Sequence, residues 1–83
     1  MKAKIKVVLK RNILDPQGKA VLHAINDLKY SDVKDVRIGK YIEIEFNETD
    51  KKAVLEETEE ICKKLLANPI MEYYNYEIEE ELH

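Results

Sequence analysis

The sequence is poor in residues that carry chemistry or covalent crosslinks. Its 83 residues include one cysteine, two histidines, two glycines and no tryptophan. A single cysteine cannot form a disulfide within the chain, and this favours a reducing compartment. Two glycines are too few for the glycine-rich loops that surround phosphate groups. These shortages argue against a disulfide-stapled domain and against a nucleotide-binding loop.

The sequence also lacks an excess of positive charge and any long apolar run. Lysine and arginine number 14 against 17 acidic residues, which gives a net charge of -3, whereas nucleic-acid binders usually carry a basic excess or a basic face. No apolar run approaches the roughly 20 residues that cross a membrane, and the first residues show no signal-peptide core. We therefore expect residues 1–83 to form one soluble, cytoplasmic domain that binds neither nucleic acid nor membrane.

No catalytic or metal-binding set emerges from the side chains present. The only serine, His23 and His83 are far apart in the chain, and with the lone cysteine they match no zinc-site spacing. Cys62 falls on the apolar arc of a predicted helix, where a thiol is usually buried and inert. The acidic cluster of Glu56, Glu57, Glu59 and Glu60 indicates a solvated helix face. We expect no catalytic residue, bound cofactor or metal ion in this chain.

Hydrophobic periodicity predicts alternating strands and helices. The predicted elements are strands at 2–10 and 70–79 and helices at 16–29 and 50–67. The number of strands in the stretch 33–46 is ambiguous. Apolar residues are at even-numbered positions both before and after Gly39, so they would lie on one face of a single strand. A hairpin there gives the order β-α-β-β-α-β, an α+β fold with an antiparallel sheet and two helices on one face. One long strand bent at Gly39, shared between two halves or two subunits, fits the parity as well.

Each predicted helix has an apolar stripe that should face the sheet. The first stripe consists of Ala20, Val21, Ala24, Ile25 and Leu28. The second consists of Val54, Thr58, Ile61, Cys62 and Leu65. If the first and third strands are neighbours, Lys4 and Lys6 would form cross-strand pairs with Glu43 and Glu45.

Three apolar residues lie off the predicted core and indicate a contact surface. Met71 and Tyr73 share one face of the last strand, and Val8 joins them if that strand borders the first. Because such patches mark interfaces, we expect self-association through Val8, Met71 and Tyr73.

Gly18 is unusual in a first helical turn, where glycine is less favourable than alanine by up to ~1 kcal/mol. Either close packing on a neighbouring segment or the close approach of a partner chain would explain it.

Three segments, in order along the chain, resemble the signatures of one family. They are Leu14–Ala20 (LDPQGKA), Asp35–Ile42 (DVRIGKYI) and Cys62–Tyr74 (CKKLLANPIMEYY). The chain is similar over nearly its whole length to the PurS family, the small subunit of phosphoribosylformylglycinamidine synthase. The resemblance nominates residues that either contact a partner or shape a turn: Asp15, Pro16, Gln17, Gly18, Lys19, Arg37, Gly39, Lys40, Asn68 and Pro69.

The resemblance implies a non-catalytic role in de novo purine biosynthesis. The family's complex uses ATP, Mg and glutamine to convert formylglycinamide ribonucleotide to the formylglycinamidine. The synthetase PurL holds the nucleotides, the glutaminase PurQ releases ammonia, and PurS binds both, self-associates as a dimer or tetramer and supports ammonia transfer. The competing interpretation is a dimeric small-molecule-sensing α+β module, since such layers often bind ligands at dimer interfaces. No loop of this sequence shows the converging polar groups that such a module needs.

Overall fold

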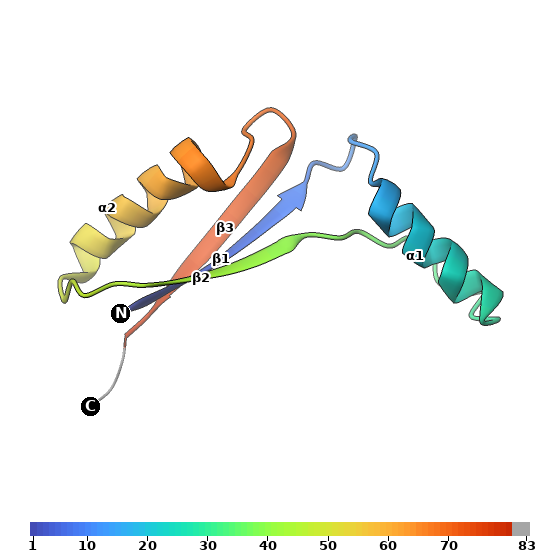
Figure 1. The fold of residues 1–83 in the computed structure, drawn as a ribbon, viewed down its shortest axis with the longest axis horizontal. Coiled ribbons are helices and arrows are strands. Elements are labelled where there is room, and N and C mark those ends of the chain that lie inside the picture. The colour runs from blue at the N-terminus through green and yellow to red at the C-terminus, as the bar shows by residue number, and fades with distance from the viewer. Residues whose placement is uncertain (81–83) are drawn as a thin grey trace.

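A computed structural model describes residues 1–80, so His83 lies outside the described residues. Figure 1 shows a sheet of three strands with one helix beside it and another beyond its end. The elements are β1 (Lys2–Leu9), α1 (Pro16–Asp27), β2 (Lys40–Glu45), α2 (Lys51–Ile61), the π-helical turn η1 (Cys62–Leu66) and β3 (Glu72–Glu79). The α+β class and the antiparallel sheet predicted from the sequence are confirmed. Among residues 1–80, no helix is both long and apolar enough to cross a membrane.

β1 is the central strand, with β2 and β3 antiparallel on either side. Its alternation follows from the sequence: Ala3, Ile5 and Val7 are fully buried, and the lysines between them lie on the other face. Lys4 stands opposite Glu43 of β2, so the predicted neighbourhood of these strands is confirmed. The predicted pairing of Lys6 is wrong, because Lys6 stands opposite Tyr41 and Glu45 stands opposite Lys2. The ion pairs themselves run diagonally, from Lys4 to Glu79 at 2.8 Å and from Lys2 to Glu43 at 3.6 Å.

α2 packs on the apolar face of the sheet and closes the core. Val54, Thr58 and Cys62 recur at helical spacing and are fully buried, as predicted. Leu65 belongs to the same predicted stripe but is 79% exposed, so its assignment to the core was wrong. The cause is η1, because a π-helical turn advances each residue by a smaller angle than an α-helix and rotates Leu65 off the buried face.

The central hairpin predicted for residues 33–46 is wrong. In the described residues this stretch holds one strand, β2, and residues 33–39 lead into it from α1 without a strand of their own, giving the order β-α-β-α-β. Gly39 serves close approach instead of a reversal, since a Cβ there would lie 2.8 Å from the Val7 carbonyl oxygen and 2.9 Å from Val8 Cγ1. The alternative of one long strand bent at Gly39 is not found either, because the strand begins only at Lys40 in the described residues.

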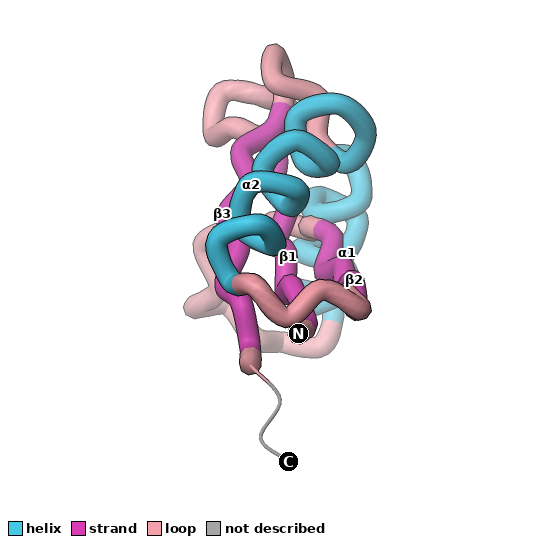
Figure 2. Tube along the Cα trace, turned by 90° about the vertical axis from the view of Figure 1, so that its left-hand side faces the viewer, coloured by secondary structure: helices cyan, strands magenta, loops and turns pink. Residues whose placement is uncertain are grey.

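α1 does not cover the sheet, contrary to the prediction that both helices share one face. It projects past the end of the strands in Figure 1, and Figure 2 shows α2 on the near side of the strands with α1 behind. Its predicted buried stripe is therefore largely open to solvent, with Val21 39% and Leu28 69% exposed. The described chain is extended, 49 × 32 × 14 Å, and its helical layer is incomplete.

Candidate functional site

The three family-like segments meet at one end of the sheet. The antiparallel register brings the end of β1 beside the start of β2 and the start of β3, since Val7 pairs with both Lys40 and Tyr74. A hollow of about 270 Å³ lies at this junction. Its lining draws on all three strands and on the start of α1: Val7, Leu9, Asp15, Gln17, Ile38, Gly39, Lys40 and Glu72. We refer to this region as the motif end.

Asp15 holds the first two segments together. Its side chain caps α1 by accepting a hydrogen bond from the Gly18 N–H at 3.0 Å, as the sequence predicted. Its second carboxylate oxygen accepts from the Ile38 N–H at 2.7 Å, a contact between segments that no local pattern reveals. The two backbone hydrogen bonds, first from Ile38 and then from Gly18, hold the pKa of Asp15 below its ordinary value, and the charge of Arg37 acts in the same direction.

Gly18 and Arg37 reinforce this connection. A Cβ on Gly18 would lie too close to the Val36 carbonyl oxygen and 2.9 Å from the Asp15 carboxylate, so close packing explains the glycine. Arg37 donates from one guanidinium nitrogen to the carbonyl oxygens of Lys10 and Ile13, each at 2.9 Å. These bonds tie the segment before β2 to the loop that leads into α1, where Pro16 occupies the first helical turn.

Asn68 shapes the turn between η1 and β3. Its side-chain oxygen accepts from the Ile70 N–H at 3.0 Å, and its own N–H donates to the Glu72 carboxylate at 2.8 Å. Its carbonyl oxygen accepts from the N–H groups of Met71 and Glu72, and Pro69 lies within the same turn. The backbone groups of Asn68 and its side-chain oxygen therefore all have hydrogen-bond partners within the chain.

Gln17, Lys19 and Lys40 are exposed, as are Arg37 and Asn68. Unlike those two, they make no side-chain hydrogen bond to the backbone of the described residues. Gln17 and Lys40 line the hollow at the motif end, and Lys40 Nζ lies 3.7 Å from the Glu72 carboxylate. Lys19 is on the first turn of α1. Asp15, Arg37 and Asn68 thus bond to backbone groups of this chain through their side chains, whereas the exposed ammonium group of Lys40 forms an ion pair.

The predicted contact patch is assembled on the outer face of the sheet. Val8 stands opposite Tyr73 in the register, and the Lys10 N–H donates to the Met71 carbonyl oxygen at 2.8 Å. Val8, Met71 and Tyr73 are 44%, 41% and 58% exposed. Lys10 Nζ lies 5.4 Å from the centre of the Tyr73 ring, within the range of a cation–π contact. The patch exists as a surface, and its role in self-association stays a prediction.

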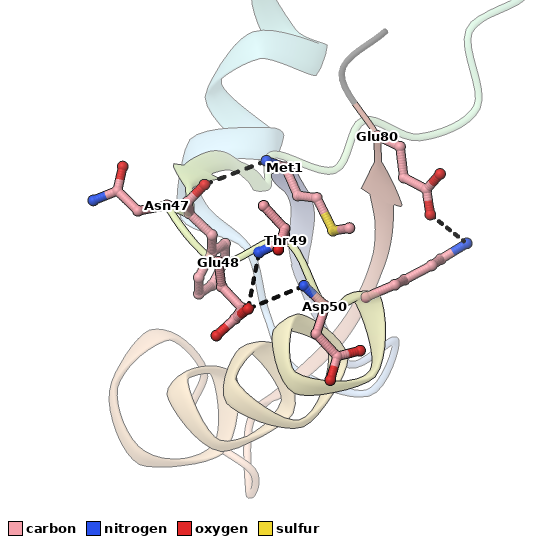
Figure 3. A pocket seen from close by; sticks show the side chains of 8 residues that line it. Met1, Asn47, Glu48, Thr49, Asp50 and Glu80 are labelled. Atoms are coloured by element: carbon pink, nitrogen blue, oxygen red, sulfur yellow. Dashed lines mark hydrogen bonds and ion pairs between the residues drawn. The ribbon is translucent and has the colours of Figure 1, made fainter.

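The opposite end of the sheet holds a hollow of about 540 Å³ around the start of α2, shown in Figure 3. Asp50 caps α2 through the Lys52 N–H, and Glu48 accepts from the N–H groups of Thr49 and Asp50. These two hydrogen bonds lower the pKa of Glu48, that from Asp50 more than that from Thr49. Carboxylates already occupy the helix N-terminus, so the hollow does not suit an anionic ligand.

Glu59 is an exception to the solvated helix face predicted from the sequence. Its carboxylate accepts from the hydroxyls of Tyr74 at 2.9 Å and Tyr76 at 2.8 Å, which fixes α2 over β3. The tyrosine hydroxyls, that of Tyr76 foremost, lower the pKa of Glu59, while burial followed by the hydrogen bond to Glu59 raises the pKa of Tyr76 to about 12. The sequence signal was the pair of tyrosines on the buried parity of the last strand, because phenolic hydroxyls need partners there.

Cys62 is placed where a thiol is unreactive. Cys62 is fully buried against the sheet, and burial, with a smaller contribution from Glu59, raises the pKa of its thiol, which keeps it protonated. Within residues 1–80, no three His, Cys, Asp or Glu side chains come together as metal ligands would. The exposed groups at the motif end and in the outer patch are suited to contacts with other proteins.

These features define a small α+β protein with an incomplete helical layer and exposed apolar side chains, the kind of structure that association completes. The family model for PurS, phosphoribosylformylglycinamidine (FGAM) synthase, matches residues 2–80, and the chain belongs to this family. It is 50% identical over 80 residues to the phosphoribosylformylglycinamidine synthase subunit PurS of Bacillus subtilis, covering 95% of this chain and 93% of that one. The PurS subunit of Methanocaldococcus jannaschii is 40% identical over 78 residues, covering 94% of each chain.

Solved structures agree with the sequence relatives. The crystal structure of PurS from Methanocaldococcus jannaschii superimposes with a TM-score of 0.86 at 40% identity and covers 98% of both chains. A chain in the structure of PurLQS from Thermotoga maritima superimposes with a TM-score of 0.82 at 32% identity, covering 92% of this chain and 93% of that one. The family resemblance read from the three segments is confirmed.

Proposed function

We propose that this chain is the non-catalytic small subunit of an FGAM synthase complex. In this role it joins the synthetase PurL to the glutaminase PurQ and supports the transfer of ammonia between them. The observation that carries the proposal is its full-length similarity to a chain of a structure that holds PurL, PurQ and PurS together. The match to PurS relatives over more than nine-tenths of the chain supports the same role.

The chemistry of the complex explains why a subunit without catalytic groups is useful. Ammonia released by a glutaminase would be protonated or lost to water before it reached a distant electrophile, so a closed path between the active sites favours the reaction. ATP and Mg belong to the synthetase in this proposal, and no nucleotide is assigned to the small subunit. The complex is cytoplasmic, consistent with the single unpaired cysteine.

The geometry divides the ten residues nominated by the resemblance into two groups. Three of them form side-chain hydrogen bonds inside the chain: Asp15, Arg37 and Asn68. Gly18 allows the backbone to pack closely against Val36. We assign these four residues, with Pro16, Gly39 and Pro69, to turn shaping. Gln17, Lys19 and Lys40 present exposed side chains around the motif end, and we assign partner contact to these three.

Reconstitution tests the proposed role. The chain is mixed with its cognate PurL and PurQ, and FGAM formation is measured once with glutamine and once with free ammonium as the nitrogen source. Glutamine-dependent formation should require the chain, whereas ammonium-dependent formation should depend on it far less, because ammonium bypasses the transfer path. Full glutamine-dependent activity of PurL and PurQ without this chain would remove the basis of the proposal.

Charge reversal at the motif end tests the assignment of contacts. Lys40→Glu and Lys19→Glu should lower the affinity for the two larger subunits by roughly 10-fold or more, since an interfacial charge pair becomes a repulsion. Lys64→Glu, on an exposed side chain of η1, is the matched control. Equal binding of all three variants, measured by titration into PurL and PurQ, contradicts the assignment.

The sensing-module alternative is not favoured by the family match. A metabolite that alone raised the melting temperature by several degrees would favour it, because a ligand that binds only the folded state stabilises that state.

A further inference from the structure

The outer face of the sheet carries apolar side chains that no helix of residues 1–80 covers. α2 lies on the inner face, where Cys62 packs with Ile5 and Val7. α1 projects past the end of the strands (Figure 1). On the outer face, Val8 and Tyr73 stand opposite each other in the register, and both are exposed. This face is therefore open to contact with another molecule.

The charges at one end of the outer face are paired within the chain. Lys4 Nζ lies 2.8 Å from the Glu79 carboxylate, and Lys2 Nζ lies 3.6 Å from the Glu43 carboxylate. A carboxylate from outside would compete there with partners that are already in place. This end of the face gains little from a charged partner.

The cations at the motif end of the same face have no such partners. Lys6 stands between Tyr41 and Asn75 in the register, so no acidic residue faces it across the strands. Lys6, Lys10 and Arg11 take part in no ion pair of the chain that the structure describes. The whole chain carries a net charge of -3, so this positive region stands out against an acidic background.

A hollow of about 570 Å³ lies beside the outer patch. Arg37 is held at its edge, since its guanidinium donates to two backbone carbonyl oxygens, each at 2.9 Å. Asp35, the one acidic residue of the lining, accepts from the Val36 N–H at 2.9 Å. The hollow combines apolar walls, a tyrosine ring and two guanidinium groups, and its lining is Val8, Leu9, Arg11, Asp35, Arg37 and Tyr73.

Two of the positive groups are already positioned around this hollow. Lys10 Nζ lies 5.4 Å from the centre of the Tyr73 ring, and Arg37 is fixed by its bonds to the backbone. Side chains that are held in place lose less conformational freedom when a partner binds. Arginine and tyrosine are also enriched among the residues that contribute most to binding at protein interfaces. The complementary surface has an apolar side chain flanked by carboxylates.

A second copy of the chain fits the outer patch poorly. If the patch met itself across a two-fold axis, Lys10, Arg11 and Arg37 would face their own counterparts, and like charges repel. At the other end of the face, Glu43 and Glu79 already pair with lysines, so that end offers the patch few unpaired carboxylates. The patch therefore suits an acidic surface of a different protein.

We propose that the outer patch docks an acidic segment of one of the larger subunits of the complex. An apolar side chain of that segment enters the hollow beside Val8 and Tyr73, and its carboxylates pair with Lys10, Arg11 and Arg37. The inference rests on the proposed function and deepens it, because it adds a second contact surface to the motif end. It also gives the outer patch a partner other than the second copy predicted from the sequence.

Substitutions of the charged and apolar parts of the patch test the docking. The double variant Lys10→Glu/Arg11→Glu should raise the dissociation constant for the binding subunit by roughly 100-fold or more. Tyr73→Ala should raise it by roughly 10-fold. Arg37 is left unchanged, because it holds the loop before α1. PurL, PurQ and their mixture are titrated separately by calorimetry, which identifies the subunit that carries the acidic segment.

The matched control is Lys52→Glu/Lys64→Glu, which changes the net charge by the same amount on exposed positions of α2 and η1. It should bind like the parent chain. Raising the salt concentration should weaken binding of the parent and have a smaller effect on Lys10→Glu/Arg11→Glu, because fewer charge pairs remain to be screened. Circular dichroism confirms that all variants are folded, and light scattering should give every isolated variant the mass of the parent.

Three results would overturn the inference. Folded patch variants that bind PurL and PurQ like the parent place the contact elsewhere. Patch variants whose isolated mass falls below that of the parent show that the patch joins copies of the chain. Inorganic phosphate or ATP that raises the melting temperature of the parent but not of Lys10→Glu/Arg11→Glu assigns the hollow to a small anion.

Glutamine-dependent FGAM formation separates this inference from the proposed function. With saturating amounts of each variant, activity should approach that of the parent, because weakened docking is overcome by mass action. A parent chain that neither binds nor restores activity defeats the proposed function together with the docking. An active parent whose patch variants bind and act equally well defeats the docking alone.

Discussion

Gly18 shows how a single small residue directs the backbone at the motif end. A side chain at this position would press against the Val36 carbonyl oxygen and the Asp15 carboxylate at once. Gly18→Ala should therefore lower the free energy of unfolding by about 1–3 kcal/mol, although alanine is the better helix former. Urea denaturation measures the change, with Gln17→Ala on the exposed neighbouring position as control. A stabilised Gly18→Ala variant would show that the close packing is absent in solution.

Thr58 is the opposite case, a buried residue whose polar atom has nothing to bond. It is fully buried in α2, and its hydroxyl is the one buried side-chain polar atom within residues 1–80 that lacks a hydrogen-bond partner. Thr58→Val keeps the shape and removes the desolvated hydroxyl, so it should raise the free energy of unfolding by about 1 kcal/mol. The denaturation midpoint reports the gain, and Thr49→Val in the exposed loop is the control. A loss of stability would indicate that the hydroxyl is bonded.

At the scale of elements, the contact between α2 and β3 depends on proton positions that pH can change. The pKa of Tyr76 is raised to about 12, so its contribution to stability is complete below the ordinary tyrosine pKa near 10 and is lost as pH rises through 12. The melting temperature should fall over this range, and the phenolate absorbance should show late titration that Tyr76→Phe reduces, with the hydrogen bond to Glu59 also raising the pKa of Tyr74. Tyr41→Phe, an exposed tyrosine, is the control and should keep that late titration.

The same contact should weaken in acid. The pKa of Glu59 lies below its ordinary value of 4.5, so its contribution to stability is present above that value and is lost as pH falls through the lowered pKa. Glu59→Gln should flatten the decline in melting temperature on acidification, whereas Glu57→Gln should not. An unchanged acid profile of the Glu59 variant contradicts the role of the tyrosine hydroxyls.

Much of each element could be predicted from sequence, because the signals are local. Alternation fixed β1 and β3, Asp15 and Pro16 marked the start of α1, and spacing placed Val54 and Cys62 in the core. The prediction of a hairpin at Gly39 was wrong because the alternation of apolar residues does not show whether the chain reverses direction there. That choice depends on the close approach of Gly39 to β1, a contact distant in sequence.

The sequence predicted the segments that form the candidate site, but not that they come together in the fold. The three segments were recognisable one by one, and so was the pair of tyrosines on one parity. Their convergence follows from strand register, and the bond from Ile38 to Asp15 joins residues 23 positions apart. The stripe of α1 was predicted correctly as a stripe and wrongly as buried within one chain, because periodicity identifies an apolar face without identifying what covers it.

At the scale of the whole molecule, stability should depend on protein concentration. If the helical layer is completed by a second copy, unfolding includes dissociation, and each tenfold dilution lowers the stability of the dimer by about 1.4 kcal/mol. The melting temperature should therefore fall on dilution, as calorimetry or circular dichroism would show. The Val21→Asp variant should melt at a temperature independent of concentration. A parent chain whose melting is equally insensitive to dilution would argue for a self-sufficient monomer.

The outward course of α1 has a consequence for how the protein is supplied in the cell. Val21 and Leu28 stay exposed on a single copy of the chain until a partner covers them. Copies without a partner would therefore be recognised by proteases and chaperones more readily than assembled ones.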